Sequence, residues 1–388
     1  MRGGDMTPVD RTSGTKKILF VVAHAPSLIN HRWSLMCALI AQGHELVVCA
    51  PDIADDIRRR IVAIGAAVVE TPISRTGLNP LADLRYMWLL IRLLERHNPD
   101  LLITFTIKPN IWGAFAGHRV GVPSIAMVTG LGYAFTDSGS FRQMATGAIA
   151  RLLYRRATGR NRYVVFQNVD DREYFVRTGC LTDSGKAVIT NGSGVDIAHY
   201  APAALPAEPV FLSIARLLRN KGVREYAEAS VALKRSHPHA RFLLVGNWDE
   251  GPDGIEPSAM GRWVAGGLEH LGPTDDVRPA IAKSNVFVLP SYREGTPKVV
   301  LEAMSMGRSV ITTDAPGCRE TTIDGANGFI VPVRDTETLL ERMRQLADDP
   351  ALREAFGRQS RQIAEAKYDA RLVNEGLLRD VGLLRTGD

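Results

Sequence analysis

The chain has 388 residues, of which 45% are apolar and 23% charged, a composition typical of a soluble globular protein. Its length exceeds what one ordinary hydrophobic core organises and therefore predicts two domains. The four cysteines show no CxxC spacing, which favours a reduced, cytosolic setting over a disulfide framework.

The positive charge is concentrated in the first half of the chain. The net charge is +5, but residues 1–200 hold 23 Lys and Arg against 16 Asp and Glu, whereas residues 201–388 hold 24 against 26. This asymmetry predicts either an anionic partner for the first half or an arginine-rich surface without a partner.

Buried strands and helices alternate along the first half. Residues 1–15 are expected to be a disordered tail, because they are polar and the apolar run after them, 18–23, is too short for a signal peptide or a membrane span. Strands are expected at 17–23, 45–50, from 68, 99–105 and 124–129, and helices at 30–43, 53–64, 81–97 and 111–119. Such alternation favours parallel βαβ units in a doubly wound sheet.

The same pattern restarts after an Ala/Pro-rich stretch at 201–209, which is expected to be a linker. Strands are expected at 209–214, 241–245, 285–289, 309–313 and 329–331, and helices at 221–236, 278–282, 297–307, 336–347, 350–366 and 370–384. The fold class is therefore α/β with two similar halves.

The stretch from 290 to 307 predicts an anion site. A loop with Glu294 and Gly295 follows an apolar strand, Thr296 is the expected N-cap, and Pro297 the expected first helical residue. Free backbone N–H groups at such a helix start attract a diphosphate. The second carboxylate, Glu302, follows in the second helical turn, so the site would also suit a hydroxyl-rich ligand.

Two nucleotide motifs are missing from the sequence. Neither Gly130 with Gly132 nor the run 192–196 completes GxGxxG, and there is no P-loop, so a nicotinamide dehydrogenase and a P-loop NTPase are poorly supported. Gly130 and Gly132 nevertheless follow a strand, where they would either admit a ligand close to the backbone or serve as turn glycines.

Cationic side chains follow the first strand of the second half. Arg216 and Lys221 would face the crevice at the strand ends, a good match to a diphosphate, although each could be a solvated surface residue. No Asp-x-Asp and no spacing typical of metal ligands occurs, so we expect no metal. His31 and Lys108 follow strands of the first half and are further candidates, with a structural role as the alternative.

One segment bears on membranes. Between Ser138 and Val169 there are six arginines and no acidic residue, with apolar residues at roughly helical spacing. The pattern fits either a basic amphipathic helix on anionic lipid or a core helix with a solvated Arg face. The helix around Trp88 is a second candidate, for which simple core is the alternative.

These residues resemble the retaining glycosyltransferases of family 4. The segment 294–302 resembles the E-x7-E signature of that family, and Arg216 with Lys221 and Gly222 resembles its diphosphate-binding pair. Further similar segments are 192–196, 270–277 and 327–331, and segments similar to a bacterial subgroup that builds sugars on undecaprenyl diphosphate are 105–110, 128–133, 165–168 and 293–297.

The resemblance implies the GT-B fold, in which two Rossmann-like doubly wound domains face a cleft. The amino-terminal domain, 16–200, would bind the acceptor, and the carboxyl-terminal domain, 210–366, would bind the nucleotide sugar. The segment 367–388 would be a helix that returns to the first domain.

The resemblance also implies roles for the site residues. The nucleobase would meet the loop around Gly272 and Val277, Glu302 would bind ribose hydroxyls, and Glu294 would orient the donor sugar. The diphosphate would lie on Arg216 and Lys221 and on the helix start, which comprises Gly295, Thr296, Pro297, Lys298 and Val299. Many family members carry a His where this chain has Lys108, so Lys108 is the expected substitute and His31 the second choice.

The implied activity is metal-independent transfer of a sugar, an N-acetylhexosamine, from a UDP-sugar to a polyprenyl-diphosphate-linked sugar. The UDP-sugar would be a substrate, and no cofactor or nucleic acid is expected. The protein would lie in the cytoplasm, peripherally on the anionic inner membrane. The alternatives are a nucleotide-sugar epimerase of the same fold, a glycosyltransferase with a soluble acceptor, and a non-catalytic sugar-binding protein.

Overall fold

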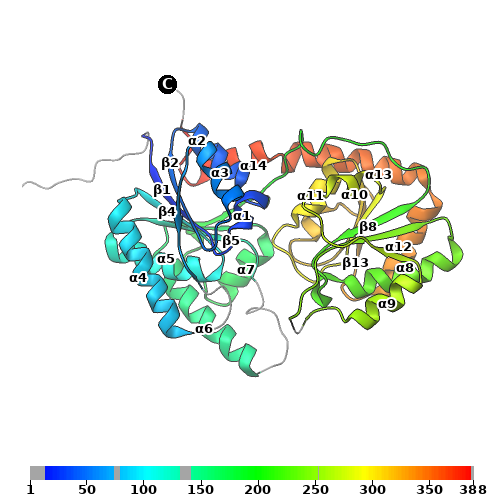
Figure 1. Cartoon of the computed structure of the whole chain (residues 1–388), viewed down its shortest axis with the longest axis horizontal. Coiled ribbons are helices and arrows are strands. Elements are labelled where there is room, and N and C mark those ends of the chain that lie inside the picture. The colour runs from blue at the N-terminus through cyan, green and yellow to red at the C-terminus, as the bar shows by residue number, and fades with distance from the viewer. Residues whose placement is uncertain (1–13, 74–78, 132–140, 252, 386–388) are drawn as a thin grey trace, which may run out of the picture.

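The computed structural model describes residues 14–73, 79–131, 141–251 and 253–385, and it divides into two lobes, each built on one parallel sheet (Figure 1). Gly132 and the side chains of 141–146 lie outside the described part. No helix within these ranges combines the length and hydropathy needed to cross a bilayer.

The first lobe contains a seven-stranded sheet with the order β3-β2-β1-β4-β5-β6-β7, in which every pairing is parallel. Its strands are β1 (Lys17–Val21), β2 (Glu45–Ala50), β3 (Ala67–Glu70), β4 (Leu101–Phe105), β5 (Ser124–Val128), β6 (Tyr163–Phe166) and β7 (Ala187–Ile189). The apolar runs β1, β4 and β5 are almost entirely buried, as expected for a sheet with helices on both faces.

The helices of the first lobe cover both faces of its sheet. They are α1 (Pro26–Asn30), α2 (Trp33–Ala41), α3 (Asp55–Ala63), α4 (Pro80–His97), α5 (Ile107–Val120), α6 (Phe141–Thr158) and α7 (Val169–Arg177). The first three pack with the even-numbered side chains of β1, whereas α4 and α5 pack with its odd-numbered ones. The doubly wound fold predicted for this half is therefore confirmed.

The second lobe repeats the design with six parallel strands in the order β10-β9-β8-β11-β12-β13. Its strands are β8 (Val210–Ile214), β9 (Arg241–Val245), β10 (Leu268–His270), β11 (Val286–Leu289), β12 (Ser309–Thr313) and β13 (Gly328–Val331). Its helices are α8 (Val223–Ser236), α9 (Pro257–Ala265), α10 (Arg278–Ala282), α11 (Lys298–Ser305), α12 (Thr336–Asp348) and α13 (Pro350–Ile363).

The last helix, α14 (Ala370–Asp380), leaves the second lobe and packs against α2 of the first (Figure 1). Leu377 and Leu378 join the core of the first lobe, and the His44 ring lies 2.9 Å from the Leu383 carbonyl oxygen. The backbone also pairs Val195 with Asp369. The chain therefore crosses between the lobes twice.

Several predicted boundaries differ from the structure. The helix expected at 30–43 is two helices, because Pro26 starts α1 at its first helical position and the chain breaks at His31 and Arg32. Helix α5 begins at Ile107 and not at 111, since Pro109 is tolerated in the first turn of a helix. The short strands β6, β7 and β10 and the helices α7 and α9 were not among the predicted elements.

Arg308 fixes the linker to the second lobe. This fully buried side chain donates to the carbonyl oxygens of Ala203 (2.9 Å), Ala204 (3.3 Å), Ile281 (3.0 Å) and Ala282 (3.4 Å). Its guanidinium thus joins residues near the start of the linker to the end of α10.

We expect Arg308→Met to lower the free energy of unfolding by about 3 kcal/mol, because it leaves buried carbonyl oxygens without donors. Chemical denaturation followed by circular dichroism measures this loss. The control is Arg358→Met, which removes only an exposed pair with Glu354 and should change stability by less than about 0.5 kcal/mol. Equal effects of both variants would contradict the role given to Arg308.

Candidate active site

The carboxyl ends of the two sheets face each other across the junction of the lobes. The loop after β11, residues 290–297, meets the loops after β5, β6 and β7 there. In open α/β sheets, ligands bind at the carboxyl ends of the strands. The predicted anion site therefore lies at the place where a ligand would touch both lobes.

The start of α11 differs from the prediction by one residue. Pro297 is the N-cap and Lys298 the first helical residue, so Pro297 is not inside the helix. Thr296 does not cap it, because its hydroxyl donates to the Gln167 carbonyl oxygen of the first lobe (2.9 Å). The backbone N–H groups of Lys298 and Val299 begin the helix and have no acceptor within it, as an anion site requires.

Glu294 and Lys221 meet beside this helix start. Lys221 Nζ lies 2.5 Å from Glu294 Oε1, and the Ser291 hydroxyl donates to the same oxygen (2.8 Å). Both charged side chains are mostly buried, with 20% and 16% of their surface exposed. The arrangement places a cation and a carboxylate side by side. A phosphate could bind the Lys221 ammonium group in place of Glu294, and a sugar hydroxyl could bind the Glu294 carboxylate in place of Lys221.

Arg216 lies further out in the same lobe. Its guanidinium is 3.2 Å from Asp249 Oδ2, and more than half of the side chain is exposed. Trp248, which precedes Asp249, is also exposed and makes an edge contact with the His270 ring at 5.8 Å. These side chains border the loop with Gly272, whose φ of +72° and open surroundings suit a close approach. Val277 follows that loop as the N-cap of α10.

Glu302 is buried in the second turn of α11. Its Oε1 lies 3.4 Å from Lys298 Nζ, and Tyr200 donates a hydrogen bond to the carboxylate. Burial raises the pKa of Glu302, whereas Lys298 and Tyr200 act in the opposite direction. Two donors already hold this carboxylate, so it is more enclosed than the sequence suggested.

Lys298 links the lobes. Its Nζ donates to the Asn30 carbonyl oxygen at the end of α1 (2.5 Å), beside His31. His31 is exposed to solvent, yet the protein atoms around it and the charges of Arg32 and Lys298 lower its pKa to about 3. His31 is therefore neutral at physiological pH and lies at the junction, as predicted.

Lys108 is held away from the junction by a partner of its own. Its Nζ lies 2.8 Å from Asp83 Oδ1, and both side chains are mostly buried. The pair joins α5 to α4 inside the first lobe. A ligand would have to compete with Asp83 to use this ammonium group.

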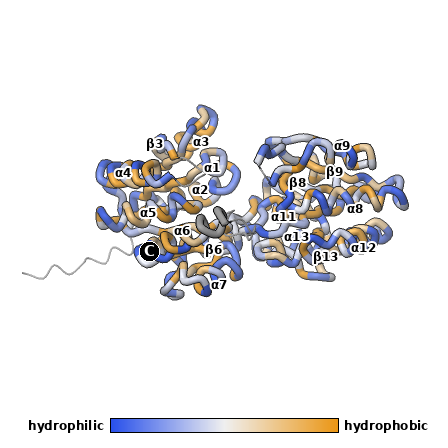
Figure 2. Tube along the Cα trace, turned by 90° about the horizontal axis from the view of Figure 1, so that it is seen from below, coloured by the Kyte–Doolittle hydropathy of each residue, from blue (hydrophilic) through white to orange (hydrophobic). Residues whose placement is uncertain are grey.

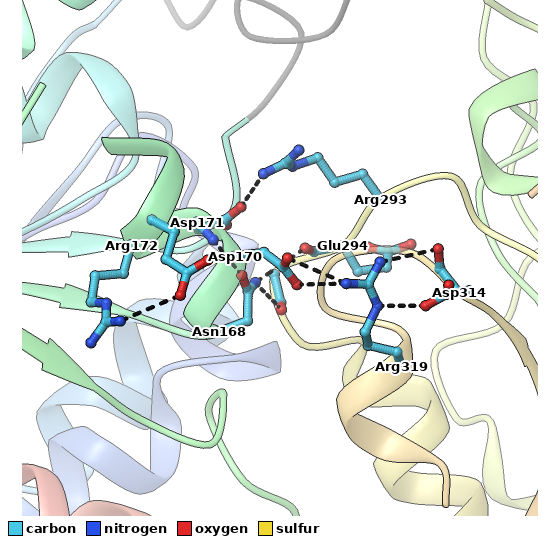
Figure 3. A network of polar contacts seen from close by, with 10 residues as sticks. Asn168, Asp170, Asp171, Arg172, Arg293, Glu294, Asp314 and Arg319 are labelled. Carbon is cyan, nitrogen blue, oxygen red and sulfur yellow. Dashed lines mark hydrogen bonds and ion pairs between the residues drawn. The ribbon is translucent and has the colours of Figure 1, made fainter. Parts of the chain in front are cut away.

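Hydrogen bonds and ion pairs from the first lobe hold the loop that contains Glu294 (Figure 3). The Asn168 side chain accepts from Asp171 N (2.7 Å), which caps α7, and it also donates to the Gly295 carbonyl oxygen (2.7 Å). The buried Asp171 carboxylate pairs with Arg293. The residue before it, Asp170, pairs in the same way with Arg319 (3.3 Å).

Several of these contacts were missed by the sequence reasoning. Ser291, Tyr200 and the pair of Asn168 and Asp171 reach the site from three separate segments. The stretch 290–307 and the segment 165–168 carried a signal, but these four residues were not named as site residues. An Asn followed by two Asp at a helix start is a capping pattern and gives no hint of a contact with the other lobe.

Comparisons with known proteins agree with this geometry. Residues 208–349 match the family model "Glycosyl transferases group 1", and residues 30–192 match "Glycosyl transferase 4-like domain". The chain is 27% identical over 374 residues to the N,N'-diacetylbacillosaminyl-diphospho-undecaprenol alpha-1,3-N-acetylgalactosaminyltransferase of Campylobacter jejuni, covering 92% of this chain and 96% of that protein. An Escherichia coli protein named UDP-Gal:alpha-D-GlcNAc-diphosphoundecaprenol alpha-1,3-galactosyltransferase is 25% identical, over 71% of this chain and 73% of its own length.

Solved structures show the same fold. HepE of Anabaena, solved in complex with UDP, superposes with a TM-score of 0.73 at 18% identity and covers 94% of this chain and 98% of its own. Sucrose-phosphate synthase of Thermosynechococcus elongatus gives 0.76 at 17% identity, with the same coverage. The GT-B arrangement of two parallel sheets is thereby confirmed for this chain.

Gly295 lies in close contact with the first lobe. A Cβ there would lie 2.4 Å from Gln167 Oε1 and 2.8 Å from the Thr129 carbonyl oxygen, and Gly130 also faces it from the first lobe. The clash with Thr129 is with backbone and is not relieved by a rotamer change.

We therefore expect Gly295→Ala to separate the lobes without unfolding either. Hydrogen exchange measured by mass spectrometry should rise at least tenfold at residues 167–171 and 291–297. The control is Gly261→Ala in α9, where a Cβ meets nothing within 4 Å and exchange at the junction should not change. Unchanged exchange in Gly295→Ala would contradict the close contact.

Proposed function

Because the chain belongs to the group 1 and 4-like glycosyltransferases, we propose that it moves a sugar from a UDP-sugar to a sugar linked to a polyprenyl diphosphate. The observation that carries the proposal is the meeting of Lys221 and Glu294 beside the start of α11. Lys221 would bind the diphosphate and Glu294 the sugar, on either side of the bond that breaks between them. The names of the Campylobacter and Escherichia relatives support the lipid-linked acceptor.

The donor would lie along the carboxyl edge of the second lobe. Its base would meet the loop with Gly272, its ribose Glu302, and its diphosphate Lys221, Arg216 and the N–H groups at the start of α11. When the bond to the anomeric carbon breaks, negative charge grows on the leaving diphosphate. Donors fixed in place before the reaction stabilise that charge without reorganisation, which is the main electrostatic demand of the step.

Glu294 would orient the donor sugar once the diphosphate draws Lys221 away from it. The acceptor hydroxyl would attack on the face that the diphosphate leaves, so the configuration would be retained and the acceptor proton would pass to the leaving phosphate oxygen. We propose an N-acetylhexosamine as the sugar and no metal requirement, with the cations of the site acting in place of a metal.

Membrane contact is a further part of the proposal. Helices α4, α5 and α6 follow one another across the underside of the first lobe (Figures 1 and 2). On α4 the exposed residues Leu81, Leu84 and Trp88 share one face with Arg85 and Arg92. Apolar side chains interspersed with arginines suit the interface of an anionic bilayer.

Helix α6 presents a second face of the same kind. Ile149 and Leu152 are exposed beside Arg155 and Arg156, while Tyr154 and Ala157 point into the core. The exposed Ile149 and Leu152 support membrane contact over the alternative of a core helix with a solvated Arg face. We propose that the two faces hold the protein peripherally at the cytoplasmic side of the membrane that carries its acceptor.

A nucleotide-sugar epimerase of the same fold is the alternative function. It would convert the donor without any acceptor. Incubating a panel of UDP-sugars with the protein alone, and then with a lipid-linked acceptor, separates the two functions. Product that forms only when the acceptor is present supports transfer, and conversion of donor alone would overturn it.

Lys221→Ala should lower transfer by roughly 10²-fold or more, because it removes a cation that stabilises the leaving group. A radiolabelled transfer assay measures the rate. The matched control is Arg241→Ala, which removes a cation that pairs with Glu269 at the amino-terminal edge of the same sheet. Unchanged turnover in Lys221→Ala would remove Lys221 from the diphosphate site.

Replacing Arg151, Arg155 and Arg156 by Gln should weaken binding to anionic vesicles by about 10²-fold at low salt, since each charge near such a surface contributes about 1 kcal/mol. Co-sedimentation with vesicles of anionic and neutral lipid measures it. The control replaces Arg235, Arg262 and Arg358 of the second lobe, which changes the net charge equally. Equal losses of vesicle binding in both triple variants would indicate a general charge effect and would contradict membrane binding by the exposed face of α6.

A further inference from the structure

Arg32 is a buried cation that pairs with no carboxylate among the described residues. The side chain is 7% exposed, its Nε has no hydrogen-bond acceptor, and its Nη1 makes only a 3.4 Å contact with the His31 carbonyl oxygen. No carboxylate in the described part of the chain forms an ion pair with it. Burying a charge is costly, and the contacts with the His31 carbonyl oxygen and the Phe105 ring offset only part of that cost.

Two other buried arginines show what a structural role looks like in this chain. Arg308 donates to four carbonyl oxygens, and Arg353, which is 3% exposed, donates to those of Leu346 (2.5 Å) and Ala347 (2.9 Å). Both donate hydrogen bonds to the carbonyl oxygens around them. Arg32 makes only the one long contact with a carbonyl oxygen, which points to an acceptor that comes from outside the chain.

The position of Arg32 fits such an acceptor. The residue is the N-cap of α2, two residues after the end of α1, and its guanidinium lies over the Phe105 ring, 4.6 Å from the ring centre. Phe105 is the last residue of β4. The charge therefore sits at the carboxyl edge of the first sheet, where the lobes meet.

The start of α5 adds donors at the same place. Its N-cap Thr106 follows Phe105 and has a φ of +70°, a strained conformation for a β-branched residue, and its side chain does not cap the helix. The first N–H groups of this 14-residue helix thus have neither an intrahelical acceptor nor a side-chain cap. Local strain at such a position is typical of a functional site.

The other charges nearby do not neutralise Arg32. Lys108 is paired with Asp83, and Lys298, a further cation from the second lobe, is paired with Glu302. Desolvation by the surrounding protein lowers the pKa of His31 most, and the positive charges of Arg32 and Lys298 lower it further. Burial lowers the pKa of Arg32 to about 10, so the guanidinium stays charged at neutral pH.

We propose that Arg32 and the uncapped start of α5 form a second anion site, which binds the diphosphate group of the lipid-linked acceptor. The inference rests on the proposed function and adds the group that recognises the acceptor. The donor diphosphate has its own cations, Lys221 and Arg216, in the other lobe. Two diphosphates would then lie on opposite sides of the junction, each with its own guanidinium.

The test measures inorganic pyrophosphate binding by titration calorimetry with the donor site saturated by UDP. The parent protein should bind pyrophosphate under this condition, and Arg32→Met should bind it at least tenfold more weakly while UDP affinity stays the same, because a hydrogen bond to a charged group contributes about 1.5–3 kcal/mol. Equal pyrophosphate binding by parent and variant would overturn the site. Weakening of UDP and pyrophosphate alike would assign Arg32 to the donor and also overturn it.

Stability separates a ligand site from a structural role. Without ligand, Arg32→Met should keep the parent Tm or exceed it, whereas Arg308→Met should lower it. If Arg32→Met has the lower Tm instead, Arg32 has a structural role and the inference is wrong. Arg32→Lys is a second variant that tests the same conclusion. Arg32→Lys keeps a cation on Phe105 but loses the planar fork, so it should fold and still bind pyrophosphate more weakly than the parent.

Two outcomes distinguish a failure of the acceptor site from a failure of the proposed glycosyltransferase function. If the parent binds no UDP, the proposed glycosyltransferase function itself fails. If UDP binds and transfer occurs, but the KM for the lipid-linked acceptor is the same in Arg32→Met as in the parent, only the acceptor site fails. We expect that KM to rise at least tenfold with the KM for the donor unchanged.

Discussion

The close contact of Gly295 with the first lobe is the constraint on which the rest of the site depends. The glycine lies between Gln167 and the Thr129 carbonyl oxygen on one side and, through its own carbonyl oxygen, Gly317 on the other, where an added Cβ would be only 2.4 Å away. No side chain fits at either point. The loop of Glu294 is therefore held from both lobes at once, and the position of its carboxylate follows from how the lobes meet.

This constraint explains why charged pairs gather at the junction. Arg293 with Asp171 and Arg319 with Asp170 join the second lobe to the start of α7 on either side of the tight contact. Burial raises the pKa of Asp171, and the neighbouring Arg293 opposes that rise. Such pairs contribute little to overall stability but define a single orientation well, because each loses its partner if the lobes separate.

The candidate cations differ in how they are compensated. Lys221 is paired with Glu294, Arg216 with Asp249 and Lys108 with Asp83, so a ligand would have to displace a carboxylate to reach them. Arg32 has no carboxylate partner among the described residues, so an anion that reached it would displace none. The donor side would thus exchange partners on binding, whereas the proposed acceptor side would gain one.

The sequence by itself determined the two parallel αβ halves, because continuous apolar runs alternate with helices. It also determined that a loop and a helix follow β11 and that Gly307 ends this helix, but not which residue caps its start. It also singled out Glu294, Lys221 and His31, because residues after strands of a parallel sheet meet at one edge. Only the tertiary structure decided which groups are paired. Lys108 pairs with Asp83, Glu302 pairs with Lys298 and Tyr200, and Arg32 pairs with no carboxylate that the structure describes. Most of these contacts join residues far apart in the chain, which no local sequence pattern brings together.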